Sequence, residues 1–312
     1  MNHGKSNEIR VLVVDDEPEM RSFIADYLRD MAGYTVAEAE SGADALDNVL
    51  PGERFDIVLS DINMPGMKGF ELLKIVREQY PDMKRVLITA YNVEDYLELA
   101  MKYDVGNIFI KTIPFNFEEL VVLMESLLRN NIFGLKKHFS HPEAHHSFTI
   151  RKGDSLEDDA RRIVKTLPEP EKHKKLELCL FEVLTNAVFY GIRNEPPDKK
   201  EEWTFNFELS DEEAISVTAM YDDKKHGIAI LDNGGRLKKN DVLYWLHRQL
   251  TPGTEGVPVG LYDSHGRGFF IARKYIDRVI VNIERDKRTE IILMNYRANQ
   301  YSGYKPLYIN EI

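Results

Sequence analysis

Three aspartates in the first half of this 312-residue chain have the types and spacing of a cation site. Asp15 and Asp16 follow the apolar run Val11–Val14 directly. Asp61 comes just after the segment Ile57–Ser60, which begins with a second apolar run. Carboxylates that are brought together repel each other unless a cation lies between them, and a set of oxygen ligands suits Mg²⁺. These residues therefore predict a magnesium site.

Two further residues could reach the same site. Thr89 follows the apolar run Val86–Ile88, and Lys111 follows Ile108–Ile110. A lysine beside a metal-bound carboxylate can stabilise the charge on a transferred phosphoryl group. A single aspartate after a strand is more often a turn residue or a helix cap. All five positions together favour a phosphoryl-transfer site.

The second half holds a different set of candidates. Glu182 and Asn186 lie four residues apart, on one face of an otherwise apolar helix. Such a polar stripe commonly forms hydrogen bonds within the fold. Downstream, an apolar run ends at Asp232, and a glycine turn with Gly234 follows. A carboxylate there could accept a hydrogen bond from an exocyclic amine, while glycine lets a flat ring approach; the alternative is an ordinary strand-to-loop turn.

A third box, Gly266-Arg267-Gly268, precedes a helical pattern at 269–275. Glycines before a helix N-terminus form an anion site, because unpaired backbone N–H groups point at the ligand. A short glycine pattern by itself is weak evidence for an anion site. It gains weight here because it follows the Glu182–Asn186 motif and the Asp232–Gly234 motif.

The surrounding pattern predicts the elements that must position these residues. In the first half, continuous apolar runs alternate with helical patterns, which is typical of a parallel sheet covered on both faces by helices. The ligands of such sheets bind at the carboxyl ends of the strands. The expected helices are 20–31, 43–49, 70–78, 93–101 and 117–129. In the first of these, Phe23 and Met31 belong to the apolar stripe.

The second half predicts an α+β layer with helices on one face of an antiparallel or mixed sheet. The expected helices are 156–167 and 171–190, and the expected strands are 204–209, 215–221, 227–231, 279–283 and 290–295. We therefore expect one domain at 1–130, a linker at 131–147 and a second domain at 148–312. The linker carries His138, His141, His145 and His146, and we expect it to be solvated rather than to bind a metal.

Composition limits the class of function. The chain has 41 basic and 52 acidic residues, a net charge of −11. All of this excess lies in residues 1–130, with 13 basic and 24 acidic residues, whereas residues 131–312 have 28 of each. Nucleic-acid binding needs a basic surface, so a direct nucleic-acid partner is not expected.

The cysteine count and the absence of long apolar runs indicate the compartment. The one cysteine, Cys179, excludes an intramolecular disulfide and fits a reducing environment; its apolar surroundings predict a buried thiol. No run reaches the length of a membrane span, and the polar N-terminus lacks a signal-peptide core. We expect a cytoplasmic protein that makes no membrane contact.

The first half resembles a response-regulator receiver domain over residues 9–129, which implies a flavodoxin-like fold. The matching motifs are Asp15-Asp16, Asp61 with Met64-Pro65-Gly66 and Gly69, Thr89-Ala90, and Lys111 ahead of Pro114. The resemblance implies that Asp61 accepts the phosphoryl group and that Asp15, Asp16 and Asp61 hold Mg²⁺. It implies that Thr89 and Lys111 contact the phosphoryl oxygens, with Phe109 as the switch aromatic. The chain departs from the family at Thr112 and Ile113, which separate the lysine from the proline.

Residues 148–296 resemble the GHKL ATPase superfamily, and most closely the anti-sigma-factor serine kinases. The matching motifs are Glu182 to Ala187 with Tyr190-Gly191, Asp232-Asn233-Gly234, Gly266 to Ile271, and the segment from Tyr275 to Val281. The resemblance implies a sandwich that binds ATP. Its implied roles are Asn186 as Mg²⁺ ligand, Asp232 as adenine acceptor, Glu182 as general base, Gly234, Gly266 and Gly268 as the nucleotide frame, and Arg267 as a phosphate contact. The segment 238–265 is the implied lid, and Arg236 replaces the second glycine of the Asp-x-Gly-x-Gly box.

Three output functions are compatible with this sequence. The first is a serine/threonine kinase that acts on an anti-sigma antagonist or binds a sigma factor, under control of Asp61 phosphorylation by a sensor histidine kinase. The second is a GHKL-like domain that binds nucleotide or a partner without catalysis. The third is a hybrid histidine kinase, which the short linker disfavours because it leaves no room for a two-helix dimerisation domain. A homodimer is compatible with the resemblance.

Overall fold

The chain divides into two compact units, which are described separately in this computed structural model. Unit 1 comprises residues 1–131 and 301–306, and unit 2 comprises residues 132–300 and 307–312. The structure describes residues 9–195, 199, 204–251, 267–298 and 301–312. Within those residues, no helix is both long enough and apolar enough to cross a membrane.

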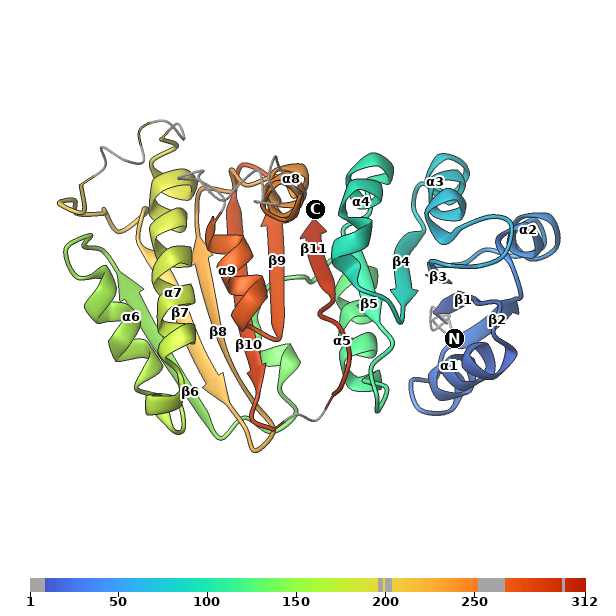
Figure 1. The fold of residues 1–312 in the computed structure, drawn as a ribbon, viewed down its shortest axis with the longest axis horizontal. Helices are drawn as coiled ribbons and strands as arrows, with labels where there is room; N and C mark the ends of the chain where they lie inside the picture. The colour runs from blue at the N-terminus through green and yellow to red at the C-terminus, as the bar shows by residue number, and fades with distance from the viewer. Residues whose placement is uncertain (1–8, 196–198, 200–203, 252–266, 299–300) are drawn as a thin grey trace, which may run out of the picture. The chain divides into compact units, whose positions relative to one another are not determined.

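Unit 1 contains a five-stranded parallel sheet in the order β2-β1-β3-β4-β5. Its strands are β1 (Arg10–Val14), β2 (Thr35–Ala39), β3 (Ile57–Asp61), β4 (Lys84–Thr89) and β5 (Asn107–Ile110). The buried runs predicted in β1, β3, β4 and β5 are all strands. This order is that of the flavodoxin-like fold, as predicted. Figure 1 shows these strands and their connecting helices, coloured from blue to green along the chain.

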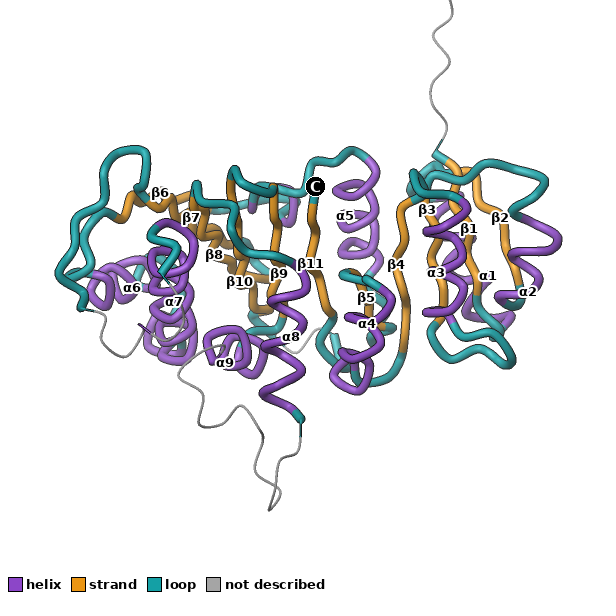
Figure 2. The backbone as a smooth tube through the Cα atoms, turned by 90° about the horizontal axis from the view of Figure 1, so that it is seen from above, coloured by secondary structure: helices purple, strands orange, loops and turns teal. Residues whose placement is uncertain are grey.

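Helices connect the strands of unit 1. They are α1 (Pro18–Asp30), α2 (Gly42–Asp44) running into η1 (Ala45–Val49), α3 (Gly69–Gln79), η2 (Val93–Tyr96) running into α4 (Leu97–Tyr103), and α5 (Phe117–Leu128). Tyr27 of α1 stacks on Phe117 of α5, whereas Phe70 of α3 meets Tyr103 of α4. Helices α4 and α5 lie on opposite sides of the strands (Figure 2), so the sheet is covered on both faces.

Two details of unit 1 differ from the sequence prediction. Strand β2 was not expected, because as an edge strand it has only Ala39 fully buried and shows no continuous apolar run. In α1 the buried residues are Ile24, Ala25 and Leu28, whereas Phe23 is 50% exposed and Met31 is 73% exposed. The predicted apolar stripe is therefore wider than the face that the sheet covers.

Unit 2 contains a mixed sheet in the order β11-β9-β10-β8-β7-β6, in which only β11 and β9 pair in parallel. Its strands are β6 (Ala144–Ile150), β7 (Ile215–Tyr221), β8 (Lys225–Asp232), β9 (Arg278–Glu284), β10 (Arg288–Tyr296) and β11 (Leu307–Glu311). The helices are η3 (Leu135–His138), α6 (Leu156–Val164), η4 (Pro170–Lys172), α7 (Lys174–Asn186), η5 (Ala187–Ile192), α8 (Lys239–Leu250) and α9 (Arg267–Tyr275).

The core of unit 2 lies between one face of this sheet and its helices. Helices α6, α7, α8 and α9 lie on the same side of strands β6 to β10 (Figure 2). Leu180 and Leu184 of α7 are fully buried in this core beside Cys179, whose thiol is buried as predicted. The predicted arrangement, a mixed sheet with helices on one face, is what the structure shows.

Several elements of unit 2 differ from the prediction. The expected strand at 204–209 is absent as a strand: its only ladder contact is an isolated bridge between Lys152 and Glu208. Strands β6 and β11 and helix α8 were not expected. The sequence of β6, Ala-His-His-Ser-Phe-Thr-Ile, is mostly polar and half-exposed along an edge, so it lacks the apolar signal of a strand.

The prediction of a solvated linker at 131–147 is also wrong in part. Within 131–147, Leu135 and Phe139 are buried, η3 forms, and the last four residues belong to β6. Burial lowers the pKa of His138 to about 3, so this imidazole is neutral at physiological pH. Only His141 and His145 of the four histidines are exposed. Apolar residues between the polar ones hold the segment on unit 2.

Candidate functional site

The carboxyl ends of β1, β3 and β5 bring three charged side chains together in unit 1. Asp15 follows β1, Asp61 ends β3 and Lys111 follows β5. The Nζ of Lys111 donates to Asp15 Oδ2 at 2.8 Å and to Asp61 Oδ1 at 2.6 Å. All three side chains are at most 10% exposed. Parallel strands point their carboxyl ends to one edge, so residues far apart in sequence meet there.

Burial and the ion pairs determine the electrostatics of this cluster. Burial raises the pKa of Asp15 from its ordinary value of 3.8, although its hydrogen bond to Lys111 opposes that shift. Burial alone would lower the pKa of Lys111, but the adjacent Asp61 and Asp15 carboxylates more than offset this and raise it. Lys111 is therefore a fixed cation between two acidic groups.

The remaining predicted residues surround this cluster. Thr89 ends β4, is fully buried, and accepts a hydrogen bond at Oγ1 from the Tyr91 N–H at 3.1 Å. Asp16 is partly exposed beside Asp15. Phe109 is 1% exposed and packs against Phe115, with 5.3 Å between ring centroids. The five residues predicted from the strand ends thus come from one edge of one sheet.

Asn63 is part of this site and was not predicted. Its N–H donates to Asp61 Oδ2 at 2.5 Å, and its Nδ2 donates to the Tyr96 hydroxyl at 2.6 Å. It therefore joins the central carboxylate to helix η2. No sequence signal distinguishes such a residue from an ordinary loop asparagine. The Ile113–Pro114 peptide bond that follows Lys111 is cis.

The donors in this cluster fit Mg²⁺ chemistry. Magnesium in proteins is usually bound by one or two carboxylates, with water and phosphate oxygens completing the shell. Asp15 and Asp61 supply two buried carboxylates that share one cation, Lys111. Over the described residues, no group of three or more His, Cys, Asp or Glu side chains is placed to hold a metal. Asp16, beside Asp15 and partly exposed, stays a predicted further ligand.

Unit 2 has a cavity of about 650 Å³ at the predicted nucleotide residues. It is lined by residues of α7, η5, α8, α9 and β10 and by the end of β8 with the loop that follows. Asn186 and Asp232, separated by 46 positions in sequence, both line it. Tyr190 and Gly191, from the first predicted box, line it too. Drug-sized ligands occupy cavities of this size in many proteins.

Asp232 is the buried acidic group of this cavity. The residue is 5% exposed, and its Oδ1 accepts a hydrogen bond from the Gly234 N–H at 2.9 Å. Burial raises the pKa of Asp232 to about 6, against the opposing effect of the Gly234 and Gly235 N–H groups. At pH 7 the carboxylate is mostly charged, and it lines the cavity.

The glycines of the predicted boxes are required by close packing. A Cβ at Gly234 would lie 1.8 Å from the carbonyl oxygen of Gly191, so only glycine fits there. A Cβ at Gly268 would lie 2.6 Å from Asn186 Nδ2 and 3.6 Å from Glu182 Oε2. The start of α9 therefore packs directly on the polar face of α7. Glu182 and Asn186 share that face, as their spacing predicted.

Arg236, which stands at the second glycine position of the predicted Asp-x-Gly-x-Gly box, lies at the cavity. Arg236 is exposed and lines the cavity, together with Tyr244 and Trp245 of α8. Helix α8 occupies part of the segment predicted to be a lid, 238–265. Its remainder, 252–265, and Gly266 lie outside the described residues, as does the Arg267 side chain.

Thr289 is a cavity residue that the sequence did not reveal. It lies directly opposite Asp232 in the β10–β8 ladder and is 2% exposed. Its Oγ1 is buried and has no hydrogen-bond partner among the described residues, and Thr289 lines the cavity. A buried hydroxyl without a partner is costly, which suits a group that bonds a ligand. Only the strand register identifies it.

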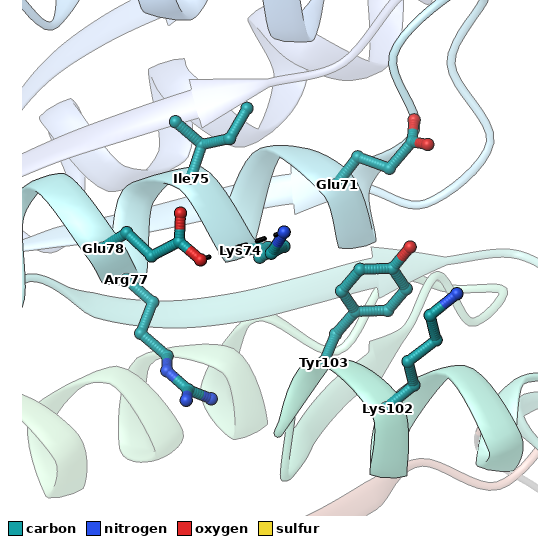
Figure 3. A pocket seen from close by; sticks show the side chains of 7 residues that line it. All are labelled: Glu71, Lys74, Ile75, Arg77, Glu78, Lys102 and Tyr103. Atoms are coloured by element: carbon teal, nitrogen blue, oxygen red, sulfur yellow. Dashed lines mark ion pairs between the residues drawn. The ribbon is translucent and has the colours of Figure 1, made fainter.

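A second hollow lies on unit 1, away from the predicted residues. It measures about 470 Å³ and lies between α3 and α4 (Figure 3). Its lining includes Lys74 and Glu78, which form an ion pair of 3.9 Å, and Tyr103. The lining is mixed in charge, and none of the predicted site residues belongs to it.

Comparison with known proteins agrees with the geometry of unit 1. The family model for the response regulator receiver domain matches residues 11–125. The chain is 34% identical over 122 residues to a CheY chemotaxis protein homologue of Campylobacter jejuni, covering 38% of this chain and 92% of that protein. It is 36% identical over 115 residues to the response regulator protein FleR of Pseudomonas aeruginosa, covering 37% of this chain and 24% of FleR.

Solved structures give similar coverage. The chemotaxis protein CheY4 of Vibrio cholerae is 33% identical, with a TM-score of 0.35 over 38% of this chain and 98% of that chain. The response regulator TrrA of Thermotoga maritima, solved in complex with Mg²⁺ and BeF, is 34% identical, with a TM-score of 0.34 over 38% of this chain and 98% of that chain. From the family match and the CheY homologue, the chain belongs to the response regulator receiver family, with its receiver domain at residues 11–125.

Proposed function

We propose that this response regulator receives a phosphoryl group on Asp61 from a sensor histidine kinase and thereby controls an ATP-binding output domain, unit 2. The output would act as a serine/threonine kinase in sigma-factor partner switching. One observation supports the output most strongly: Asn186, Asp232 and Thr289 come from three separate elements and line one cavity in a unit of the predicted architecture.

The first transfer uses the cluster at the strand ends of unit 1. The Asp61 carboxylate attacks the phosphorus of a phosphohistidine, so that a P–O bond forms, the P–N bond breaks, and the imidazole keeps the electron pair. Lys111, already 2.6 Å from Asp61, balances the added negative charge. Bound at Asp15 and Asp61, Mg²⁺ would supply further charge neutralisation.

The second transfer uses the cavity of unit 2. Asp232 would accept a hydrogen bond from the adenine amino group, and Thr289 would bond the ring edge beside it. Asn186 would hold Mg²⁺ together with the ATP phosphates. The substrate hydroxyl attacks the γ-phosphorus, its proton passes to Glu182, and ADP leaves with the electron pair of the broken P–O bond. The substrate would be a Ser or Thr of an antagonist protein.

A non-catalytic output is the second candidate, and Arg236 favours it. Its charged side chain lines the cavity where the family has glycine. An output that binds nucleotide or a partner without transfer would need Asp232 and Asn186 but not Glu182. The hybrid histidine kinase is disfavoured, because residues 132–147 form a short 3-10 helix and part of β6 rather than a two-helix domain.

The test uses ATP binding and transfer by the full chain. Wild type should bind Mg-ATP, Asn186→Ala should bind at least tenfold more weakly, and Glu182→Ala should bind normally but transfer no phosphate. Antagonist and sigma-factor candidates would come from a pull-down in native extract. If wild type does not bind ATP, the nucleotide proposal fails. If wild type binds ATP and phosphorylates no captured protein, the non-catalytic output is the better description.

Receiver phosphorylation is tested separately. A small phosphodonor with Mg²⁺ should label wild type, and Asp61→Asn should abolish the label. Ser60→Ala, at the preceding buried position of β3, is the matched control and should still be labelled. Labelling that survives in Asp61→Asn would contradict the assignment of the acceptor.

A further inference from the structure

A short segment near the C-terminus belongs to unit 1, although the residues on both sides of it belong to unit 2. This segment is Tyr301–Pro306. The Ile113 N–H donates to the Ser302 carbonyl at 2.8 Å, and the Ser302 N–H donates to the Ile113 carbonyl at 2.8 Å. The two residues thus form a reciprocal backbone bridge. The Ile113 side chain is 79% exposed, so the bridge depends on the backbone and not on side-chain packing.

The bridge lies two residues beyond Lys111. The Lys111 N–H donates to the Thr89 carbonyl at 2.8 Å, and its Nζ holds Asp61. Thr112 Oγ1 donates to the Pro114 carbonyl at 2.8 Å, which fixes the backbone on both sides of Ile113. A phosphoryl group on Asp61 changes the charge and position of the oxygens that Lys111 contacts. Ile113 follows Lys111 by two residues, so a resulting shift of the Lys111 backbone would also move the Ile113 backbone.

After Pro306 the chain enters β11, which belongs to unit 2. Asn310 of β11 donates through Nδ2 to Asn282 Oδ1 at 2.8 Å. Asn282 of β9 in turn donates through Nδ2 to Glu290 Oε2 of β10 at 2.9 Å. These three side chains are at most 4% exposed. We call them the buried polar row; its members cannot shift without breaking bonds that water does not replace.

The segment that joins α5 of unit 1 to unit 2 also contacts the buried polar row. Helix α5 of unit 1 ends at Leu128, and in unit 2 the Gly134 N–H donates to both Glu290 oxygens at 2.9 and 3.0 Å. Glu290 is adjacent in β10 to Thr289, which faces Asp232 and lines the cavity. Both chain connections therefore lead to one carboxylate, Glu290, whose neighbour in β10 lines the candidate nucleotide cavity.

We propose that the Ile113–Ser302 bridge and the buried polar row transmit the state of Asp61 to the nucleotide cavity of unit 2. The route runs from Lys111 through Ser302 and β11 to Asn310, Asn282 and Glu290, and ends at Thr289. This inference rests on the proposed nucleotide site and names its regulation. Coupling between two sites in one protein typically changes affinity about 5- to 150-fold, and we expect a change of at least about fivefold.

The experiment measures ATP affinity in the full chain with Mg²⁺, with and without BeF as the analogue of the phosphoryl group on Asp61. Wild type should show at least a fivefold difference in Kd between the two conditions. Ser302→Pro removes the N–H that bonds Ile113 and should reduce the ratio to near one, with ATP still bound. Ser302→Ala keeps both backbone bonds and should retain the wild-type ratio. Asp61→Asn, which should not bind BeF on the receiver, corrects for any direct effect of BeF on the nucleotide site.

A second variant interrupts the route further along. Asn310→Leu removes the donor to Asn282 at similar volume and should also bring the ratio near one. Hydrogen exchange of backbone amides distinguishes the effect of Ser302→Pro from that of Asn310→Leu. On addition of BeF, exchange at the β11 amides and at the Ile312 N–H that follows them, which donates to the Ile283 carbonyl, should change in wild type and in Asn310→Leu but not in Ser302→Pro. This readout requires no nucleotide.

The outcomes distinguish the two proposals. If Ser302→Pro folds and keeps the wild-type Kd ratio, the bridge is not the route and the inference is wrong. If wild type binds ATP equally with and without BeF, the inference fails while the proposed nucleotide site stands. If wild type binds no ATP, both fail. If Ser302→Pro does not fold, the test depends on Asn310→Leu. The route is supported if this variant has a Kd ratio near one and its β11 amides still change their exchange when BeF is added. The route is wrong if the variant keeps the wild-type Kd ratio.

Discussion

Lys111 shows how one residue determines the chemistry of the receiver site. It is buried between Asp15 and Asp61, and it is the cation that both carboxylates share in the described structure. Removing one member of a buried ion pair leaves charge without compensation, which commonly costs more than the pair itself contributes. The same charge that stabilises the fold is therefore available to neutralise a phosphoryl group.

Lys111→Ala should lower the free energy of unfolding of unit 1 by about 3–5 kcal/mol at neutral pH. Because Mg²⁺ would bind the same carboxylates, millimolar Mg²⁺ should restore part of the loss. Urea titration followed by circular dichroism measures both effects. Lys74→Ala is the control, since its pair with Glu78 is about 60% exposed on both sides, and it should change stability by less than about 1 kcal/mol. A Lys111→Ala protein as stable as wild type would contradict the role of the ion pairs.

Asp232 carries a cost to stability that its proposed role in binding explains. Its pKa is raised from 3.8 to about 6 by burial, so the folded state binds a proton more tightly than the unfolded state does. The contribution of Asp232 to stability is therefore most favourable below about pH 4, where the group is protonated in both states, and it declines as pH rises through 4 to 6. The full cost, on the order of 3 kcal/mol, applies at pH 7.

Asp232→Asn should stabilise unit 2 at pH 7 and remove this pH dependence, while it weakens ATP binding. In wild type, ATP affinity should fall as pH drops below about 6, because the protonated group loses acceptor capacity. Thermal melts from pH 4 to 8 and ATP titrations over the same range measure the two effects. The Asn variant controls for protonation of ATP itself. Equal pH profiles for ATP binding in both proteins would exclude Asp232 as the acceptor.

At the scale of elements, α7 positions the catalytic candidates by packing. Its inner face carries Leu180 and Leu184, both fully buried, and its polar face carries Glu182 and Asn186. Helix position and rotation are thus set by the core of unit 2. The start of α9 packs against the polar face at Gly268. The geometry of the candidate site follows from how these two helices are held on the sheet.

Leu184→Ala should destabilise unit 2 by about 2–5 kcal/mol, because it leaves a cavity in a close-packed core. The expected consequence is weaker ATP binding without the loss of any cavity residue. Leu178→Ala, on the same helix but at a residue that is 45% exposed, should change stability by less than about 0.5 kcal/mol. Chemical denaturation monitored by tryptophan fluorescence compares them, since Trp245 belongs to α8 of unit 2 and residues 1–131 of the sequence contain no tryptophan. Similar losses in both variants would show that burial does not determine the effect.

At the scale of the whole molecule, the two units differ in charge and in the ligand proposed for each. Residues 1–130 carry the entire net charge of −11, whereas residues 131–312 are neutral. Part of that acidity is the Asp15, Asp16 and Asp61 cluster, which suits a divalent cation. The proposed ligand of unit 2 is a nucleotide bound mainly by a buried carboxylate, an amide and backbone groups.

Each ligand should therefore stabilise its own unit. Mg-ATP at 100 times its Kd should raise the stability of unit 2 by about 2.7 kcal/mol, and Mg²⁺ with BeF should stabilise unit 1. Scanning calorimetry of the full chain, with Asn186→Ala and Asp61→Asn as controls, assigns each shift. The Asn186→Ala protein should lose only the ATP shift, and Asp61→Asn only the BeF shift. An ATP shift that persists in Asn186→Ala would place the nucleotide elsewhere.

The sequence by itself determined the receiver fold, the edge of its sheet where a site forms, and the polar boxes of unit 2. Buried parallel strands produce continuous apolar runs, and their carboxyl ends converge, so Asp15, Asp61 and Lys111 could be grouped without coordinates. Helical spacing likewise placed Glu182 and Asn186 on one face. These are local patterns combined with one rule of topology.

Only the tertiary structure identified the edge strands and the contacts across them. Strands β2 and β6 are partly exposed and polar, so no apolar signal marks them. Thr289 became a site residue because strand register sets it opposite Asp232, and Ser302 became part of unit 1 because its backbone pairs with Ile113. Register and backbone pairing between distant segments depend on how the whole chain packs. Sequence spacing alone does not carry that information.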